Sequence, residues 1–247
     1  MKKIAVIIPV WKRNAVFELC VEQLNVFCEK NTDKADIMVI YILSVDDPEV
    51  LIHQNTIKQS THKSLTIYSD NNKLGQKIND AVIMADKMDF DYIMNAGSDD
   101  LFHPKLISLY LPFINLEVPF FGLSSVYFYQ PGKCSFRYHY YNNKHLVGAG
   151  RMIHRSVWKK VFNRFGFLYT PDICRGMDTH SANNIKSVGF EGVFVNDNHF
   201  PYIVDVKSDV NITDFDIIYQ TALRNAAISD TNIDLSKYFK VLKNENN

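Results

Sequence analysis

The sequence predicts an α/β fold: an open, mostly parallel central sheet flanked by helices, and a smaller antiparallel sheet. Over the first hundred or so residues, apolar runs typical of strands alternate with segments whose apolar residues recur at helical spacing. This alternation predicts parallel strands joined by right-handed crossovers. After Pro104, two runs flank the turn Gln130-Pro131-Gly132-Lys133, and the second alternates in period two, which predicts an antiparallel pair.

The first 104 residues contain four predicted strands and three predicted helices. Their continuous apolar, β-branched runs are typical of strands buried on both faces. The polar residues between elements follow the strands, so we expect them to gather at one edge of the sheet. The predicted strands are Ile4–Val10, Asp36–Val45, Ser64–Tyr68 and Phe90–Asn95, and the predicted helices are one that begins at Asn14 and stops at Asn31, then Glu49–Gln59 and Leu74–Met88.

The second half mixes short strands with helices and has no linker that separates it from the first. We therefore expect a single domain, 1–247, with halves 1–115 and 116–247. The predicted strands are Pro119–Tyr129, a half-exposed Cys134–Tyr141, Arg151–His154, Phe190–Asn196 and Tyr202–Val206. After Pro104 the predicted helices are Lys105–Ile114, which ends the first half, and in the second half one capped by Ser156, one capped by Asp178 or Thr179 and ended by Gly189, and Asp214–Ile228.

Composition indicates an ordinary globular protein of 247 residues, 47% hydrophobic and 22% charged, with a formal net charge of zero. This balance gives no overall preference for nucleic acid or an anionic membrane. The four cysteines form no CxxC pair, so we expect reduced, buried thiols in a cytoplasmic protein. The opening MKKIAVIIPVWKR is interpreted as a strand rather than a signal peptide, because Pro9 breaks its short apolar run. No apolar run approaches the roughly 18 to 20 residues of a membrane span.

The stretch DYIMNAGSDDLFHP, from Asp91 to Pro104, places two adjacent carboxylates after a predicted strand. Asp99 and Asp100 then lie at the carboxyl end of that strand, where open α/β sheets bind ligands. Neighbouring carboxylates repel each other unless a cation or hydrogen-bond donors hold them. Oxygen ligands of this kind suit Mg²⁺ or Mn²⁺ bound together with the phosphates of a substrate. The alternative is a solvated Asp-Asp turn that caps the next helix.

Four short motifs in order resemble those of the family 2 glycosyltransferases, which have the GT-A fold. The opening IAVIIPVWKR resembles the first strand of that family, which lines the base of the donor. The resemblance implies that the second strand ends in an acid that contacts the base, and that the helix start at Asn72–Asn79 lies near the diphosphate. The donor-binding residues implied by these motifs are Pro9, Val10, Trp11, Arg13, Asp46, Asp47, Lys77 and Asn79.

The double Asp resembles the Asp-x-Asp motif of the same family, with Asp99 and Asp100 as metal ligands and Gly97 where the first Asp normally stands. Ser98 or Asn95 would then substitute for the missing contact, and we count Ser98 with the donor-binding residues. In the second half, Gly176-Met177-Asp178 takes the place of a Glu-Asp pair, with Met177 replacing the Glu. The resemblance makes Asp178 the general base and His199 a further metal ligand.

Several of these residues also have ordinary structural interpretations. Trp11 follows a core strand, where packing is a common role for an aromatic side chain. Asp178 fits a helix N-cap. His199 lies in the loop sequence DNHFP, where a histidine commonly makes hydrogen bonds to its neighbours.

The resemblance implies an inverting, metal-dependent transferase that takes a sugar from a nucleotide-diphosphate-sugar donor, with Mn²⁺ or Mg²⁺ as cofactor. Its first half would bind the donor and its second half the acceptor, which remains open between a saccharide, a protein and a modified DNA base. Nucleic acid enters only as such an acceptor. Two alternatives remain: a nucleotidyltransferase, although VWKRNAVF lacks the Gly-rich loop this requires, and an inactive nucleotide-binding module, in view of Gly97 and Met177.

Overall fold

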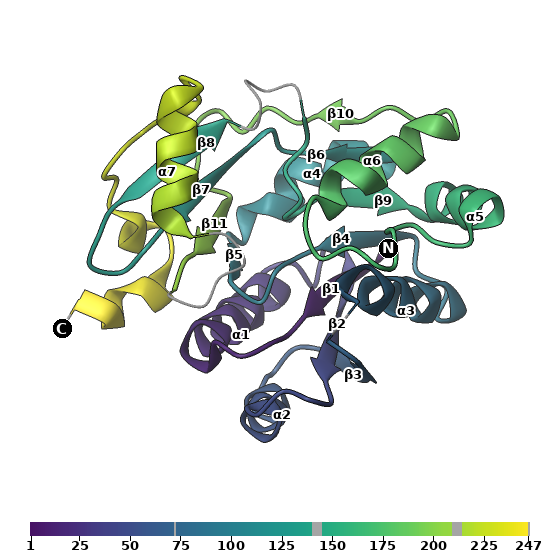
Figure 1. Ribbon diagram of the computed structural model, residues 1–247, viewed down its shortest axis with the longest axis horizontal. Coiled ribbons are helices and arrows are strands. Elements are labelled where there is room, and N and C mark those ends of the chain that lie inside the picture. The colour runs from purple at the N-terminus through teal and green to yellow at the C-terminus, as the bar shows by residue number, and fades with distance from the viewer. Residues whose placement is uncertain (72, 140–144, 209–213, 247) are drawn as a thin grey trace.

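The computed structural model describes residues 1–71, 73–139, 145–208 and 214–246, and their strands form two sheets (Figure 1). The larger sheet has seven strands in the order β10-β6-β9-β4-β1-β2-β3. Strands β3, β2, β1 and β4 are parallel, and β9 runs antiparallel to both β4 and β6. The strands are β1 Lys3–Pro9, β2 Asp36–Ser44, β3 Ser64–Ser69, β4 Tyr92–Asn95, β6 Phe120–Gly122, β9 Met152–His154 and β10 Val193–Phe194.

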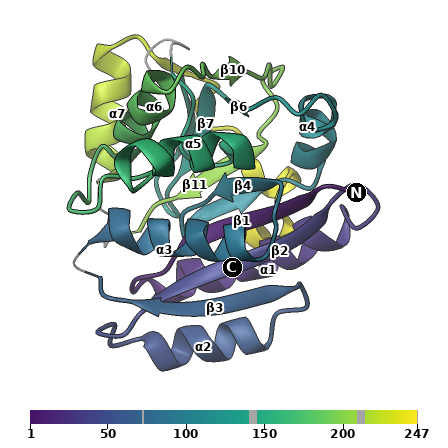
Figure 2. The same cartoon turned by 90° about the vertical axis from the view of Figure 1, so that its right-hand side faces the viewer.

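Both faces of the larger sheet are covered, which explains the continuous apolar runs in its central strands. In β1, Ile4, Val6 and Ile8 pack into one hydrophobic cluster, whereas Ala5 and Ile7 pack into another on the opposite face. Figure 2 shows β3 as the outer strand of the parallel part of this sheet. The first cluster includes residues of α1 Asn14–Glu29, α2 Val50–Lys58 and α4 Lys105–Asn115, and the second those of α3 Leu74–Lys87, α5 Arg155–Phe165 and α6 Met177–Ser187.

The smaller sheet has five strands in the order β12-β8-β7-β11-β5. Its strands are β5 Asp100–Phe102, β7 Ser125–Tyr129, β8 Ser135–His139, β11 Ile203–Val206 and β12 Ile228–Ser229. The short strand β5 begins at Asp100, directly after the loop that follows β4, and pairs antiparallel with β11. The polypeptide therefore passes from the larger sheet to the smaller one at the double Asp, which places that motif between the two sheets.

The predicted fold class is confirmed: the structure has a mostly parallel central sheet and a smaller, mostly antiparallel one. Every helix and strand predicted in the first half is present, with ends that differ by one or two residues. The antiparallel pair around the turn at Gly132 is β7–β8. Asn72, Tyr140 and Tyr141, which belong to predicted elements or motifs, lie outside the described residues.

Several details of the second half were wrong. The helix predicted as Asp214–Ile228 ends at Arg224, and Ile228 belongs to β12. The strand predicted as Phe190–Asn196 is only Val193–Phe194. The predicted strand Pro119–Tyr129 is two strands, β6 and β7, which belong to different sheets. The strand predicted to be half exposed, β8, is mostly buried, since α7 Phe215–Arg224 packs Phe215 and Tyr219 against Phe136. The helix caps also differ, because His154 caps α5 and Gly176 precedes α6, so that Asp178 lies in the first turn of α6.

Two expectations drawn from composition have different outcomes. Cys20 and Cys28 are buried as expected, but Cys134 is half-buried and Cys174 is exposed, so burial of all four thiols was wrong. Within the described part of the chain, the helices are all too short or too polar to span a bilayer.

Candidate active site

A cavity of about 520 Å³ lies where the two sheets meet, at the carboxyl ends of β1 and β4. Residues from both halves of the chain line it. Asp99 from the first half and Asp178 from the second share this cavity. Of the predicted site residues, it is lined by Pro9, Trp11, Arg13, Lys77, Ser98, Asp99, Asp100 and Asp178.

The loop between β4 and β5 turns two carboxylates toward each other in a small space. The backbone N–H of Gly97 donates a hydrogen bond to Oδ2 of Asp100. A Cβ at position 97 would lie 2.4 Å from Oδ1 of Asp99 and 3.1 Å from Oδ2 of Asp100. A side chain is therefore excluded at Gly97 by the two acids that follow it. The departure from the Asp-x-Asp pattern at Gly97 thus has a steric reason.

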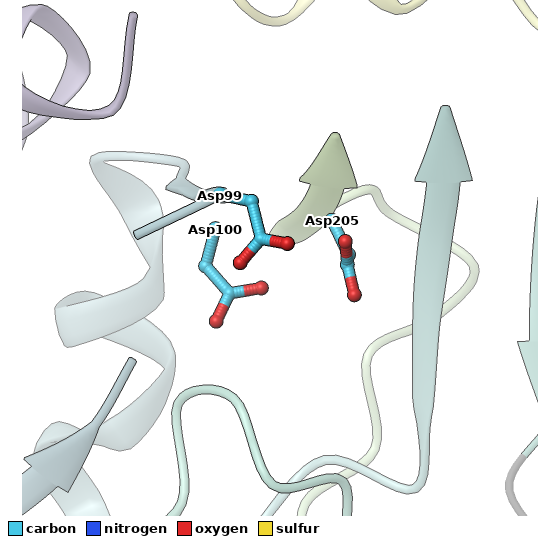
Figure 3. A group of neighbouring side chains, drawn as sticks. All are labelled: Asp99, Asp100 and Asp205. Atoms are coloured by element: carbon cyan, nitrogen blue, oxygen red, sulfur yellow. The ribbon is translucent and has the colours of Figure 1, made fainter. Parts of the chain in front are cut away.

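A third carboxylate, that of Asp205, comes from β11 and joins Asp99 and Asp100 (Figure 3). The antiparallel register of β11 and β5 pairs Asp205 with Asp100, and the Val206 N–H donates to the carbonyl of Asp99 over 2.8 Å. One oxygen from each of the three acids lies within 4.8 Å of the others. Two strands distant in sequence thus build an acidic cluster, which comprises Asp99, Asp100 and Asp205.

Two cations accompany the acidic cluster. Arg13 donates from Nη1 to Oδ2 of Asp99 over 2.6 Å and from Nη2 to Oγ of Ser98 over 2.8 Å. Lys207 donates to Oδ2 of Asp205 over 2.7 Å, and its Nζ lies 3.9 Å from Oδ2 of Asp99. These side chains are largely buried, so their charges interact more strongly than they would in bulk water.

The three acids differ in pKa because their partners differ. Burial disfavours the charged form of Asp99, but the Arg13 and Lys207 charges outweigh it and hold its pKa below the ordinary value. Burial and the charges of Asp205 and Asp99 raise the pKa of Asp100 well above the ordinary value. Burial also raises the pKa of Asp205 to about 6, although Lys207 opposes this shift. At neutral pH the negative charge of the acidic cluster therefore lies on Asp99 and Asp205 rather than on Asp100.

The acidic cluster fits a divalent cation by its donor set and by one unsatisfied atom. Carboxylate oxygens are the hard ligands that Mg²⁺ and Mn²⁺ prefer. Among the described residues, Oδ1 of Asp205 is buried and has no hydrogen-bond partner. A buried acceptor without a donor is costly, and a cation would satisfy it. The predicted ligand His199 is not part of this group: its side chain is 71% exposed and its Nδ1 lies 3.4 Å from Oδ2 of Asp230.

Asp178 also lines the cavity, from the first turn of α6. Gly148 makes room for it, since a Cβ there would lie 2.2 Å from Oδ2 of Asp178. Arg151 is buried and donates from Nη1 to the Asp178 carbonyl over 3.0 Å, while its Nη2 donates to the Leu146 carbonyl over 2.8 Å. The Asp178 side chain is 44% exposed. Asp178 is thus fixed by its backbone and keeps an accessible carboxylate.

The helix start predicted to meet a diphosphate makes its contacts within the protein. Backbone N–H groups of Gly75 and Gln76 donate to the carbonyls of Ile173 and Pro171. Lys77 is fully buried and donates to the carbonyl of Val10 over 2.8 Å, and burial lowers its pKa to about 8. Lys77 still lines the cavity, beside the carboxyl end of β1.

The remaining predicted donor residues lie outside the residues that line the cavity. Val10 is fully buried and Asp46 is exposed. Asp47 is buried and accepts hydrogen bonds from the backbone N–H of Lys12 over 2.7 Å, so it supports the loop that carries Arg13. The side-chain amide of Asn79 bonds to the backbone of Tyr169 and Leu168.

Sequence reasoning missed Asp205. It lies near the end of β11, a strand predicted as Tyr202–Val206 that runs from Ile203 to Val206. Alternation along that strand places Asp205 on the same face as its β7 partner Phe128, which lines the cavity. A charged residue at the end of an otherwise apolar strand was the available signal. The pairing of β11 with β5 places Asp205 beside Asp100, and this pairing is a long-range contact.

No family model and no curated protein matches the chain in sequence. In three dimensions it matches a mannosyltransferase, PcManGT from Pyrobaculum calidifontis in complex with GDP-Man and Mn²⁺, with a TM-score of 0.61 and 13% identity over 87% of this chain and 59% of that one. It matches S. aureus TarS 1-349 in complex with UDP with a TM-score of 0.58 and 11% identity over 100% of this chain and 71% of that one. The chain has the GT-A fold.

The GT-A fold also accommodates other enzymes. The chain matches the 4-diphosphocytidyl-2C-methyl-D-erythritol synthase of Anaerococcus prevotii with a TM-score of 0.51 and 12% identity over 90% of this chain and 96% of that one. It spans about three fifths of the length of the mannosyltransferase chain. These likenesses establish the GT-A fold, and the chemistry has to be argued from the cavity.

Proposed function

We propose that this chain is a metal-dependent glycosyltransferase that moves a sugar from a nucleotide-diphosphate-sugar donor to an acceptor hydroxyl, with inversion. The observation that carries the proposal is that the acidic cluster and Asp178 line one cavity at the carboxyl ends of parallel strands. Such a cavity is the usual ligand site of an open α/β sheet. The mannosyltransferase that shares the fold is described in complex with GDP-Man and Mn²⁺.

The acidic cluster would hold the cation, with Asp99 and Asp205 as the principal ligands and Asp100 beside them. We favour Mn²⁺ or Mg²⁺ because the ligands are carboxylate oxygens. When bound, the cation supplies positive charge that stabilises the leaving nucleoside diphosphate. His199 is left out of the proposed ligand set because it lies apart from these acids.

The donor would lie mainly against the first half of the chain, 1–115. Arg13 and Ser98 flank Asp99 and are the residues placed to meet phosphate oxygens. Trp11 lines the same cavity, where its ring offers a stacking surface for a base. Asp205 and Lys207 also line the cavity but come from the second half, 116–247. The proposed diphosphate site therefore takes residues from both halves of the chain.

Asp178 would act as the general base that deprotonates the acceptor hydroxyl. Its carboxylate is accessible, it faces the cavity, and the first turn of α6 fixes its backbone. A single base opposite the leaving group supports direct displacement and hence inversion. A positioned base of this kind typically contributes about 10²–10⁴-fold to the rate. Saccharide, protein and modified nucleobase acceptors all offer the hydroxyl that this step needs.

Two alternatives make different predictions from the same cavity. A nucleotidyltransferase is suggested by the fold likeness to the diphosphocytidyl synthase, but the β1–α1 loop of this chain has no glycine. An inactive nucleotide-binding module is suggested by the Arg13–Asp99 ion pair, which supplies a resident positive charge at the donor site.

A titration separates the three functions. Purified protein is titrated with a panel of sugar nucleotides by calorimetry, with Mn²⁺ and with EDTA, and the products formed with water or added acceptors are then analysed. We expect Mn²⁺-dependent binding of at least one sugar nucleotide and release of its nucleoside diphosphate. Release of pyrophosphate from a nucleoside triphosphate would instead indicate a nucleotidyltransferase. Donor binding that does not depend on metal, without turnover, would indicate a binding module.

A further inference from the structure

Arg13 makes its closest contacts with Asp99 and Ser98, on the acidic loop. Nη1 lies 2.6 Å from Oδ2 of Asp99 and Nη2 lies 2.8 Å from Oγ of Ser98. Only 13% of the arginine side chain and 11% of the Asp99 side chain is exposed. The planar guanidinium therefore binds the loop through both of its terminal nitrogens in a largely dry setting, where charge-assisted hydrogen bonds are strong.

The backbone directs Arg13 to this position. Lys12 and Arg13 both have positive φ, 51° and 61°, a conformation that residues other than glycine adopt infrequently. The Lys12 N–H is anchored by the buried carboxylate of Asp47, and the Arg13 carbonyl accepts the Phe17 N–H and so starts α1. These two backbone hydrogen bonds, one on each side of the Lys12–Arg13 peptide, fix the loop that places the guanidinium beside Asp99.

We propose that Arg13 and the divalent cation compete for Asp99, and that the diphosphate of a nucleotide resolves the competition by drawing the guanidinium away. This inference deepens the proposed function, on which it rests for the metal site. Asp99 is the acid that both cations approach, since Nζ of Lys207 also lies 3.9 Å from its Oδ2. A divalent cation bound to Asp99 would lie close to the positive charge of Arg13, and the two charges would repel each other.

A nucleoside diphosphate changes this balance because it offers Arg13 another anionic partner. Phosphate oxygens accept hydrogen bonds from both terminal nitrogens of a guanidinium, as the Asp99 carboxylate and the Ser98 hydroxyl do in this structure. Once Arg13 binds phosphate, Asp99 regains its affinity for the metal. Metal and nucleotide then bind cooperatively, and part of the coupling comes from Arg13, beyond any direct contact between metal and phosphate.

The test is the affinity for Mn²⁺ alone, measured from the electron paramagnetic resonance signal of free Mn²⁺, in the wild type and in Arg13→Gln. The glutamine removes the charge and keeps a donor for Ser98. We expect Arg13→Gln to bind Mn²⁺ about tenfold more tightly than the wild type, while Arg13→Lys, which keeps the charge, binds it as weakly as the wild type. Lys12→Ala is the charge-matched control. This variant loses the same charge as Arg13→Gln, but the Lys12 ammonium lies over the Trp11 ring rather than beside Asp99.

The second measurement is the coupling between Mn²⁺ and a nucleoside diphosphate, with UDP and GDP as probes. Couplings between sites typically run from about 5-fold to about 150-fold. We expect the coupling in Arg13→Gln to fall several-fold below that of the wild type. An unchanged or weaker Mn²⁺ affinity in Arg13→Gln, or an equal gain in Lys12→Ala, would overturn the inference.

Failure of the proposed function and failure of the Arg13 competition are distinguishable, because sugar transfer tests the first and Mn²⁺ affinity tests the second. If the protein transfers no sugar from any donor but Arg13→Gln still binds Mn²⁺ more tightly, the proposed function fails and the competition stands. If transfer occurs and the Mn²⁺ affinities of the wild type and Arg13→Gln are equal, the competition fails and the transferase stands. Circular dichroism and thermal unfolding of each variant establish that the fold is intact.

Discussion

The two acidic regions of the cavity are built in opposite ways. The acidic cluster of Asp99, Asp100 and Asp205 is largely buried, and Arg13 and Lys207 neutralise part of its charge. Asp178 has 44% of its side chain exposed, and Nη1 of Arg151 lies 3.8 Å from its Oδ1. Burial with partners suits groups that must stay ionised and bind a cation, whereas an accessible carboxylate suits proton transfer.

The backbone supports of the two regions differ as well. The acidic cluster depends on the pairing of β5 with β11, so two distant segments must dock before it exists. Asp178 depends on the first turn of α6 and on the absence of a side chain at Gly148. We therefore expect substitutions in the acidic cluster to affect binding, and substitutions around Asp178 to affect turnover.

The largest expected effect is on turnover in Asp178→Asn, which keeps the shape of the side chain and removes the base. We expect the turnover number to fall about 10²–10⁴-fold while the affinity for the donor stays nearly unchanged. Steady-state kinetics and donor titration measure the two quantities. The matched control is Asp172→Asn, because Asp172 is an exposed acid that pairs with Lys73. Retained activity in Asp178→Asn with loss in Asp172→Asn would move the base to Asp172.

The second effect is on metal-dependent binding in Asp99→Asn. Loss of the acid with the lowered pKa should weaken Mn²⁺-dependent donor binding by about 100-fold, at the upper end of what changes near a metal site cost. Calorimetry with Mn²⁺ and with EDTA gives the metal-dependent part. Asp46→Asn is the control, since Asp46 is exposed and lies outside the residues that line the cavity. Unaltered Mn²⁺ dependence in Asp99→Asn would remove Asp99 from the metal site.

The third effect tests whether Asp178 depends on the space at Gly148. In Gly148→Ala the new Cβ would lie 2.2 Å from Oδ2 of Asp178, so the carboxylate must move. Because a displacement of about 1 Å can cost on the order of 100-fold, we expect turnover to fall by about 10-fold to 100-fold with donor affinity preserved. Gly122→Ala is the control, since its nearest neighbour would be at 3.4 Å. Equal turnover in the two variants would contradict a positioned Asp178.

The smallest effect concerns Lys77, the buried cation at the wall of the first half. Burial lowers its pKa from 10.5 to about 8 in the folded protein. Below pH 8 both folded and unfolded states are protonated and the cost of burying the charge is fully present. Between about pH 8 and pH 10.5 the folded state loses its proton first, so stability rises with pH.

Lys77→Met should lack this rise. We expect the free energy of unfolding of the wild type, relative to Lys77→Met, to increase by about 1–2 kcal/mol between about pH 7.5 and about pH 10. Urea unfolding at several pH values measures it. Lys87→Met is the control from the same helix, because Lys87 is exposed. A constant difference across this range would mean that Lys77 titrates normally.

The elements of the first half were predictable because local pattern decides them. The β-branched runs of β1 and β2 and the helical spacing in α1 and α3 carry their own signal, and parallel pairing follows from the alternation. The predicted strand Pro119–Tyr129 failed because its break at residues 123–124 moves the chain from one sheet to the other, and the short break is flanked on both sides by aromatic, strand-forming residues.

The candidate site was predictable where motif and strand end coincide, as at Asp99, Asp100 and Arg13. It was not predictable where a residue acts through distant backbone. Lys77 and Asn79 lie on α3 as expected, but Asn79 bonds to the segment around Tyr169 and Lys77 to the end of β1. His199 lies in the expected loop and meets Asp230 rather than the acidic cluster.

By itself the sequence determined the alternating strands and helices, because burial on two faces and helical periodicity are properties of neighbouring residues. It also determined that two acids follow the fourth parallel strand, at the edge where such sheets bind ligands. Only the tertiary structure decided that Asp205 and Lys207 join these acids, and that Asp178 lines the same cavity. The physical reason is that strand pairing between segments a hundred residues apart depends on the packing of the whole chain, which no local pattern encodes.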